Sequence, residues 1–349
     1  MTKRAFERRE GELVDVYDAP SAGASSMRMD ASMLDPREPE PTRAAPSREQ
    51  IAAWVERLRA GDWSATQEVY FHRGFAGVRE ALVAACDDAL GEEEYITSTL
   101  ARVGGPGARE ALSQRLAQLA ATEATFTDAA SVTRATKLAE LARGALRLDP
   151  ESKESATALA RLFAHPAPHA RMFSAWKAAE LFIAGPPPST AAVDALSDAL
   201  AELVHGSDDD VFVKAFPALW WVARDEAVTR WRALLRAESE WVRHEAVNLA
   251  LQTRGTIELL PAMVEWLAWE PSLRTALHHA IVLAPVAPPA LVRDLTKRSL
   301  ADASPSLRWE GVGLACALPA EARRELLSAA IADEPDADLR AAMERAALD

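Results

Sequence analysis

Polar and apolar positions follow one repeating pattern along most of this chain. From Val211 to the C-terminus, a loop of Asp, Glu, Ser or Pro leads to an apolar residue, then usually an arginine, then small residues at helical spacing. The matching points lie 31, 31, 34 and 32 residues apart and are Phe212, Arg243, Arg274, Arg308 and Arg340. A repeat of about 32 residues that holds two helix-length segments predicts a solenoid of helical hairpins.

Each of the five C-terminal units carries an apolar stripe on its second helix. The stripe consists of an apolar opener and the residues four and eight positions after it. The openers are Val211, Val242, Leu273, Leu307 and Leu339. The later positions are mostly small and hold Ala215, Ala246, Leu277, Gly311 and Met343, then Leu219, Ala250, Ile281, Ala315 and Ala347. Because these three offsets span about 80° of arc on an α-helix, we expect them to be buried together between hairpins.

Residues two and six positions after the opener point away from this stripe. We therefore expect them on the exposed, concave side of the solenoid, where they form a candidate binding ridge. The ridge consists of Met172, Trp176, Val213, His244, Asn248, Thr275, His279, Trp309 and Arg345. Side chains of this kind, with little charge, suit a protein or peptide better than a phosphate backbone.

The helical pattern begins at Ser47, which is followed three residues later by Gln50 and so has the form of a helix-capping box. Residues 47–349 are expected to form a solenoid of roughly nine helix pairs, most regular over 189–349. Residues 1–46 contain five prolines and predict a disordered tail. One apolar segment in that tail, GELVDVYD, is either a chance patch or an extended segment that docks on a partner or on the solenoid.

Composition narrows the class of protein. An apolar fraction of 49% with only 15 Gly, and abundant Ala, Leu, Glu and Arg, favour a helical protein. The net charge of −13 argues against binding to nucleic acid or to anionic membranes. No apolar run is long enough to span a membrane, and the charged N-terminal sequence lacks the apolar core of a secretory signal, so we expect a cytoplasmic protein.

The sequence offers no motif for catalysis. It contains neither GxSxG, nor a phosphate-binding GxxxxGK[ST], nor GxGxxG. Cys86 and Cys316 lie far apart in Ala-rich helical segments and are expected to be buried small residues without a disulfide. We therefore expect no enzyme activity and no cofactor.

Two groups of histidines are candidates for metal ligands. His165 and His169 have the spacing of a zinc pair, but Pro166 and Pro168 prevent the helix that would align them. His278 and His279 point about 100° apart on a helix, and with His244 they could line a surface without forming a cluster with acids or cysteines. No metal site is expected.

Ten tryptophans are unusual in a chain with three Tyr and nine Phe. Six of them fall within fifty residues: Trp220, Trp221, Trp231, Trp241, Trp266 and Trp269. They form either an aromatic pocket or bulky filler between hairpins, and filling is the favoured interpretation.

On these residues the C-terminal units resemble HEAT repeats, specifically the short bacterial variety first described in phycobilisome lyases. The resemblance implies an all-α, right-handed α-α superhelix. It also implies that each repeated arginine bonds to the acidic turn of a neighbouring repeat, which assigns a structural role to Arg171, Arg243, Arg274, Arg308 and Arg340. The expected acidic partners are Asp210, Glu240, Glu270, Asp302, Asp336 and Asp338. Phe212 departs from the pattern, so its seam is expected to rely on packing.

The resemblance favours a non-enzymatic scaffold that binds a protein or peptide on the concave face. Two alternatives stay open. Certain alkylpurine DNA glycosylases are built from HEAT-like repeats with Trp and Asp in the concave groove, and a positive concave surface would mark that class. A chaperone-like pigment lyase would be marked by a lone His or Cys at the mouth of a deep pocket. The oligomeric state is left open.

Overall fold

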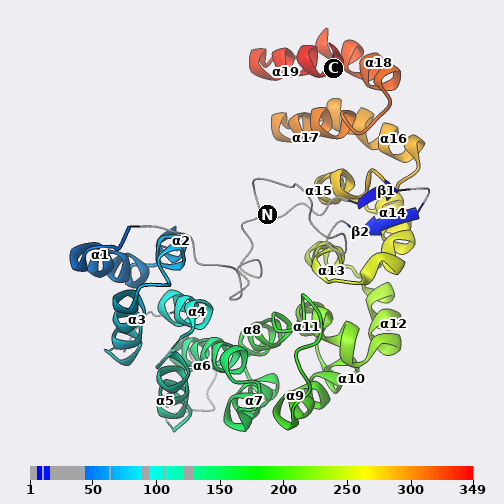
Figure 1. The fold of residues 1–349 in the computed structure, drawn as a ribbon. Coiled ribbons are helices and arrows are strands. Elements are labelled where there is room, and N and C mark those ends of the chain that lie inside the picture. Colours follow the sequence, from blue (N-terminus) through cyan, green and yellow to red (C-terminus); the bar gives the residue numbers. More distant parts are fainter. Residues whose placement is uncertain are drawn as a thin grey trace. The chain divides into compact units, whose positions relative to one another are not determined.

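The computed structural model describes residues 6–9, 12–15, 44–62, 64–88, 94–105, 107–121 and 129–348. Helices account for most of these residues, and short turns and one small hairpin account for the rest. The all-α class expected from the repeat is therefore confirmed (Figure 1). In the described part of the chain, no helix is long and apolar enough to cross a membrane.

The chain divides into two compact units between Arg230 and Trp231, inside helix α12 (Arg224–Leu234). The single repeat domain expected over residues 47–349 is thus two units. This division is compatible with a repeat array, because each helix pair packs mainly on its neighbours. Along the described residues the helices follow one another as nine pairs, from α1–α2 to α18–α19, with the short α10 between α9 and α11.

The N-terminal unit contains the helices that precede α12. They are α1 (Arg48–Arg59), α2 (Ser64–Phe71), α3 (Ala76–Asp88), α4 (Glu94–Val103), α5 (Ala108–Ala121), α6 (Ala129–Leu148), α7 (Lys153–Arg161), the 3-10 helix η2 (Leu162–Ala164), α8 (Pro168–Ala179), α9 (Ala191–Ala201), α10 (Leu203–Gly206) and α11 (Asp209–Val222).

The C-terminal unit continues the same alternation. Its helices are α13 (Glu240–Gln252), the 3-10 helix η3 (Thr256–Leu259), α14 (Leu260–Trp269), α15 (Leu273–Leu283), α16 (Pro289–Leu300), α17 (Pro305–Ala315), α18 (Ala320–Ile331) and α19 (Ala337–Leu348).

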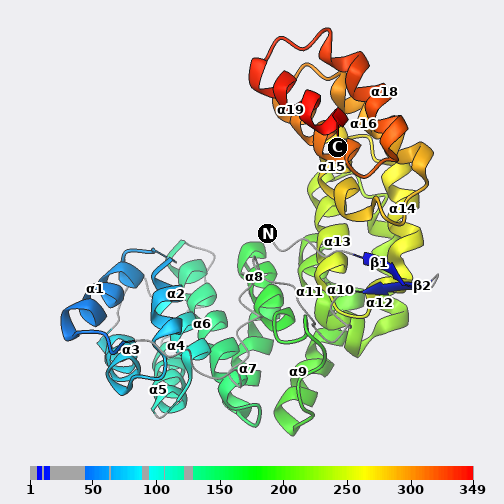
Figure 2. The ribbon, with the colours of Figure 1, turned by 45° about the horizontal axis from the view of Figure 1, so that its top comes forward.

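Within each unit the helices form two layers, as Figures 1 and 2 allow the reader to follow. In the N-terminal unit, α1, α3, α5, α7 and α9 pack in succession, and α2, α4, α6, α8 and α11 do the same. In the C-terminal unit, α13, α15, α17 and α19 pack in succession, and α16 packs on α18. We call the layer of α2, α4, α6, α8 and α11, and the layer of α13, α15, α17 and α19, the second-helix layers.

Local sequence explains where these helices begin. Ser47 accepts a hydrogen bond from the Gln50 backbone N–H (3.2 Å), and Gln50 accepts one from the Ser47 N–H (2.8 Å), so the expected capping box is present. Ser239 and Ser272 cap α13 and α15 by accepting from the N–H three residues later. These caps fix the residues at which α13 and α15 begin, and therefore which of their side chains face the neighbouring helices.

Aromatic and aliphatic side chains fill the space between the hairpins. Trp220, Trp231 and Trp266 are among the largest fully buried side chains, which confirms the filling role for these three. Trp241 and Trp269, in contrast, are about two-fifths exposed. The tryptophans therefore serve both in the core and at the surface.

One glycine sets how closely two helices approach. A Cβ on Gly311 of α17 would lie 2.7 Å from Ser299 Oγ and 3.2 Å from Leu300 Cδ2 of α16. Ser299 Oγ also donates a hydrogen bond to the Leu307 carbonyl, which holds the hydroxyl against α17. The small residue expected in the buried stripe at this point is thus required by the contact.

The tail expected to be disordered, residues 1–46, lies outside the described residues except for residues 44–46 and one hairpin. Strands β1 (Phe6–Arg9) and β2 (Glu12–Asp15) pair antiparallel, with Phe6 opposite Asp15 and Arg9 opposite Glu12. Part of the GELVDVYD segment is therefore extended.

Candidate functional site

Arg243 joins two turns of the C-terminal unit. Its Nε and Nη2 atoms each lie 2.8 Å from a carboxylate oxygen of Glu270, in a two-pronged ion pair that is buried on both sides. Its Nη1 donates to the carbonyls of Ala237 (2.8 Å) and Glu238 (2.9 Å). The guanidinium is thus bonded to the turn before its own helix and to the turn of the next pair. The hydrogen bond to Glu270 raises the pKa of Arg243, so the charge is fixed.

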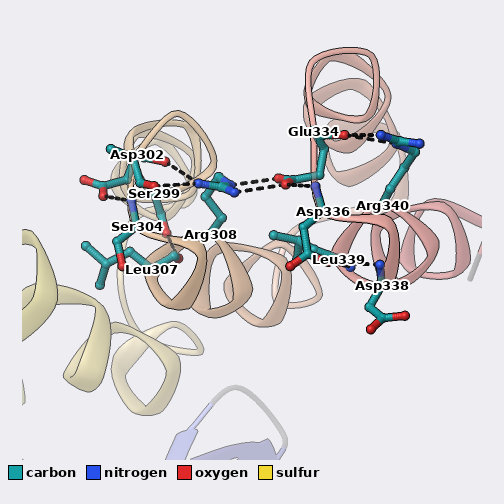
Figure 3. A network of polar contacts seen from close by, with 11 residues as sticks. Ser299, Asp302, Ser304, Leu307, Arg308, Glu334, Asp336, Asp338, Leu339 and Arg340 are labelled. Atoms are coloured by element: carbon teal, nitrogen blue, oxygen red, sulfur yellow. Dashed lines mark hydrogen bonds and ion pairs between the residues drawn. The ribbon is translucent and has the colours of Figure 1, made fainter.

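Arg308 of α17 repeats this geometry two helix pairs further on (Figure 3). Its Nε and Nη2 lie 2.8 and 3.0 Å from the two carboxylate oxygens of Glu334, and its Nη1 donates to the carbonyls of Asp302 and Ala303, both at 2.9 Å. The hydrogen bond from Arg308 opposes the effect of burial and lowers the pKa of Glu334.

One rule of position covers these arginines. Arg243 and Arg308 are each the fourth residue after the N-cap of their helix, Ser239 and Ser304. We call this position N4. Arg171 is N4 of α8, donates to the carbonyls of His165 (2.9 Å) and Pro166 (3.0 Å), and lies 2.5 Å from Asp208.

Arg340 of α19 keeps part of the pattern. It donates to the Glu334 carbonyl through Nε (3.1 Å) and Nη2. Asp336 caps this helix by accepting from the N–H of Leu339 at 3.0 Å, which makes Arg340 its N4 residue. Among the described residues, the side-chain hydrogen bonds of Arg340 all go to the turn before its own helix.

Arg274 does not belong to this set, contrary to the expectation from spacing. It is exposed and pairs with no described acid. The reason is register: α15 is capped by Ser272, so Arg274 is the second residue of the helix and points about 200° away from N4. Ala276 occupies N4 instead.

Between α13 and α15, a different contact takes the place of the N4 arginine. Glu240 of α13 accepts hydrogen bonds from Ser272 Oγ at 2.6 Å and from Thr275 Oγ1 at 2.5 Å. These two bonds, from Ser272 first, lower the pKa of Glu240. The helices α13 and α15 are thus linked by hydroxyl groups and one carboxylate.

A cation lies beside Phe212, which corrects the expectation that the helices here are held by packing alone. Phe212 occupies N4 of α11 and is fully buried. The guanidinium of Arg230, from α12, lies 4.5 Å from the centre of its ring and donates to the carbonyls of Val204 (2.7 Å) and Ser207 (2.6 Å). It also pairs with Asp209 at 3.0 Å. A guanidinium from another helix therefore supplies the bonds that N4 supplies elsewhere.

The acidic partners also differ from expectation. Of the expected acids only Glu270 receives an N4 arginine, while Glu334 and Asp208 were missed. Glu270, Asp302 and Glu334 all lie two residues before an N-cap and accept its N–H, at 3.0, 2.8 and 2.9 Å. In the sequence, each of these three acids is followed two residues later by the Ser or Asp that caps a second helix. Every contact in the set joins an arginine to residues of a turn.

The candidate ridge is only partly exposed. Trp309 is 43% exposed and Arg345 is also exposed, while Met172, Trp176, His244 and Asn248 are half-buried. The openers Val242 and Leu307 are buried as expected. These ridge residues are the fifth or ninth after the N-cap, positions N5 and N9.

Three ridge residues are buried, which corrects their assignment. Thr275 and His279 follow the register of α15: counted from Ser272, Thr275 is the third residue and corresponds to the buried openers Val242 and Leu307. Val213 lies on α11, which is buried on nearly every face and contains Pro217. A helix of this kind has no exposed side to offer.

Three histidines from two neighbouring helices come together in the C-terminal unit. His244 of α13 and His278 and His279 of α15 form a cluster in which one nitrogen from each ring lies within 4.8 Å of the other two. Burial, and then the neighbouring His244 and His278, lower the pKa of His279 well below its usual range. Adjacent helical side chains start about 100° apart, but His278 and His279 are long enough for their rings to meet His244.

A buried ion network lies in the N-terminal unit. Glu140 of α6 pairs with Arg143 of the same helix and, at 2.8 Å, with Lys177 of α8. Arg143 also lies 3.1 Å from Glu180. Burial alone would raise the pKa of Glu140, but Arg143 and Lys177 lower it to about 2.

The described residues form two pockets worth testing against the alternatives. The first, of about 410 Å³, is lined among others by Thr97, Arg115, Lys137 and Glu140, and the second, of about 490 Å³, by residues of α16, α17 and α18. Neither lining contains a histidine or cysteine.

Cys316 is exposed rather than buried as expected, because it caps the C-terminal end of α17 beyond the packed stripe.

Comparisons with known proteins do not show a family for this chain. No family model matches the sequence, and no curated protein matches it. Among solved structures, the chain is similar to an engineered protein at 18% identity and a TM-score of 0.36, with 85% of this chain and 98% of that chain covered. The functional argument therefore rests on this chain's own residues.

Proposed function

We propose that this chain is a HEAT-like helical-repeat scaffold without catalytic activity, which binds another protein or peptide along the exposed side of its second-helix layers. The observation that carries the proposal is Trp309, whose side chain is 43% exposed in the middle of a packed layer. Aromatic side chains held by a rigid helix are the residues most often found at the centre of protein interfaces.

The HEAT-like assignment is supported by the repeated use of one helix position. N4 arginines bond to their own turn in α8, α13, α17 and α19, and those of α13 and α17 also reach the acid that precedes the next second helix. A contact that recurs from pair to pair is what a repeat array requires, since each pair is stabilised mainly by its neighbours.

Charge supports a protein partner over nucleic acid. Positions N5 and N9 of the described second helices from α8 to α19 carry a single charged side chain, Arg345. A phosphate backbone is bound mainly by several Lys and Arg side chains, and the chain as a whole carries a charge of −13. The glycosylase alternative therefore has no support from charge, and the pigment-lyase alternative has no His or Cys in either pocket lining. We place the scaffold in the cytoplasm, where free thiols such as Cys86 and Cys316 stay reduced.

The test is affinity capture from the native cell extract with the full chain and two matched variants. Trp309→Ala removes the ridge aromatic, while Trp269→Ala removes an equally exposed tryptophan at the end of α14. We expect proteins captured by the wild type and by Trp269→Ala to be lost with Trp309→Ala. If the captured set is identical for all three proteins, the ridge is not the binding surface.

A further inference from the structure

Three imidazole rings from two neighbouring helices meet in the C-terminal unit. The ring centres of His244 and His279 are 4.8 Å apart, and His278 lies 4.9 Å from each of them. The three rings are thus mutually adjacent, with His244 on α13 and the other two on α15, which packs against it.

The distances between nitrogen atoms suit a metal ion. His279 Nε2 and His244 Nδ1 are 3.2 Å apart. Two nitrogens bound to one tetrahedral zinc ion at about 2.05 Å must lie about 3.3 Å from each other. The third ligand, His278, offers a nitrogen within 4.8 Å of both, so its ring must turn toward the other two to complete the set.

The surroundings leave one coordination position open. His279 is buried, and the edge of its ring contacts Trp266 at 5.4 Å between centres, which fixes its orientation. His244 and His278 are half-buried, so solvent reaches the cluster from their side. Three imidazole ligands with one open position are the ligand set of an accessible zinc site, whereas a closed structural site has four protein ligands.

A simple core contact explains the cluster less well. The hydrogen bond between His244 and His279 joins two of the three rings and does not include His278. Imidazole nitrogen is also a preferred ligand of Zn²⁺, Ni²⁺, Co²⁺ and Cu²⁺, and oxygen-seeking cations such as Mg²⁺ and Ca²⁺ do not favour it.

We propose that His244, His278 and His279 bind one divalent transition-metal ion, with Zn²⁺ as the probe ion, and that the fourth position is open to water or to a side chain from outside the chain. On binding, His244 Nδ1 and His279 Nε2 both turn a lone pair toward the ion, and the proton now shared between them moves to the other nitrogen of its ring. The site shares His244 with the candidate ridge, but its proposal does not rest on the scaffold function.

The test is a titration of Zn²⁺ into the full-length, tag-free protein, measured by competition with a coloured chelator. His278→Gln and His244→Gln each remove one half-buried ligand. His205→Gln removes an exposed histidine outside the cluster and serves as the control for weak surface binding.

We expect one Zn²⁺ per chain for the wild type and for His205→Gln, and a loss of affinity of about tenfold or more for each cluster variant. Zinc should also raise the melting temperature of the wild type and of His205→Gln, but not that of the cluster variants. No stoichiometric binding by the wild type, or equal affinity in all four proteins, would overturn the proposal. Correct folding of each variant is checked by its helical circular dichroism without zinc.

Discussion

At the scale of single residues, the position of an arginine counted from the N-cap of its helix decides whether its guanidinium is buried or exposed. Arg243 stands at N4 of α13 and is buried on Glu270, whereas Arg274 stands at N2 of α15 and is exposed. The two arginines look equivalent in the repeat, since they follow equivalent apolar residues. The difference arises because Ser272 begins its helix two residues closer to the arginine than Ser239 does.

This difference gives the first prediction. Arg243→Ala should lower the free energy of unfolding by about 3 kcal/mol, because it leaves the buried carboxylate of Glu270 without its cation. Arg274→Ala should change it by less than about 0.5 kcal/mol, as is usual for an exposed side chain without a partner. Urea denaturation followed by circular dichroism measures both. Equal losses in the two variants would contradict the N4 rule.

Two glycines of α17 give a second matched pair. Gly311→Ala should destabilise the protein by about 1–3 kcal/mol, since the new methyl group would lie 2.7 Å from Ser299 Oγ. Gly313→Ala meets only Ile281 Cδ1 at 3.8 Å and should stabilise the helix by up to about 1 kcal/mol. The same denaturation experiment distinguishes them. A stabilising Gly311→Ala would show that α16 and α17 do not approach as closely as described.

At the scale of elements, the helix pairs are linked by polar contacts as well as by apolar packing. In the C-terminal unit the links lie in the turns. In the N-terminal unit a buried network joins the middle of α6 to α8 through Glu140, Arg143 and Lys177. A buried network of this kind is stabilising only while all its charges are present.

The network predicts a pH dependence. The pKa of Glu140 is about 2 in the folded protein and about 4.5 in the unfolded chain, so the folded state binds fewer protons between these values. Its contribution, about 3 kcal/mol, is complete above pH 4.5 and is lost as the pH falls toward 2. Glu140→Gln should therefore be less stable than the wild type at pH 7, and the gap should narrow on acidification.

Urea unfolding at pH 7, 5, 4 and 3 measures this gap. Other carboxylates titrate in both proteins and cancel in the comparison. A gap that stays constant down to pH 3 would mean that Glu140 does not carry the charge assigned to it.

At the scale of the whole molecule, the sequence correctly predicted the all-α class, but it did not predict features that depend on contacts between helices. Helical periodicity and caps such as Ser47 are local signals, so the all-α class followed from them. The register of α15, the replacement of an N4 arginine by Arg230, and the meeting of His244 with His278 depend on loop length and on long side chains from neighbouring helices. A repeat period read along the chain does not contain that information.

The described helices also predict the effect of removing the N-terminal segment. Deletion of residues 1–46 should leave the melting temperature nearly unchanged, because it keeps the capping box of Ser47 and Gln50 that begins α1. Deletion of residues 1–48 removes that cap and should cost about 1 kcal/mol of stability at α1. Differential scanning calorimetry measures both. A fall of many degrees for the shorter deletion would mean that the segment is packed on the helices.

The central claim, that the exposed side of the second-helix layer binds a protein partner, is tested most directly by site-specific photo-crosslinking in the native cells. A photoreactive residue is placed at Trp309 of α17, at Arg345 of α19, and at Ser328, which is exposed on the first helix α18 of the last pair. We predict that positions 309 and 345 crosslink to the same protein and that position 328 does not. Crosslinks to that protein from position 328 alone, or none from 309 and 345, would contradict the account.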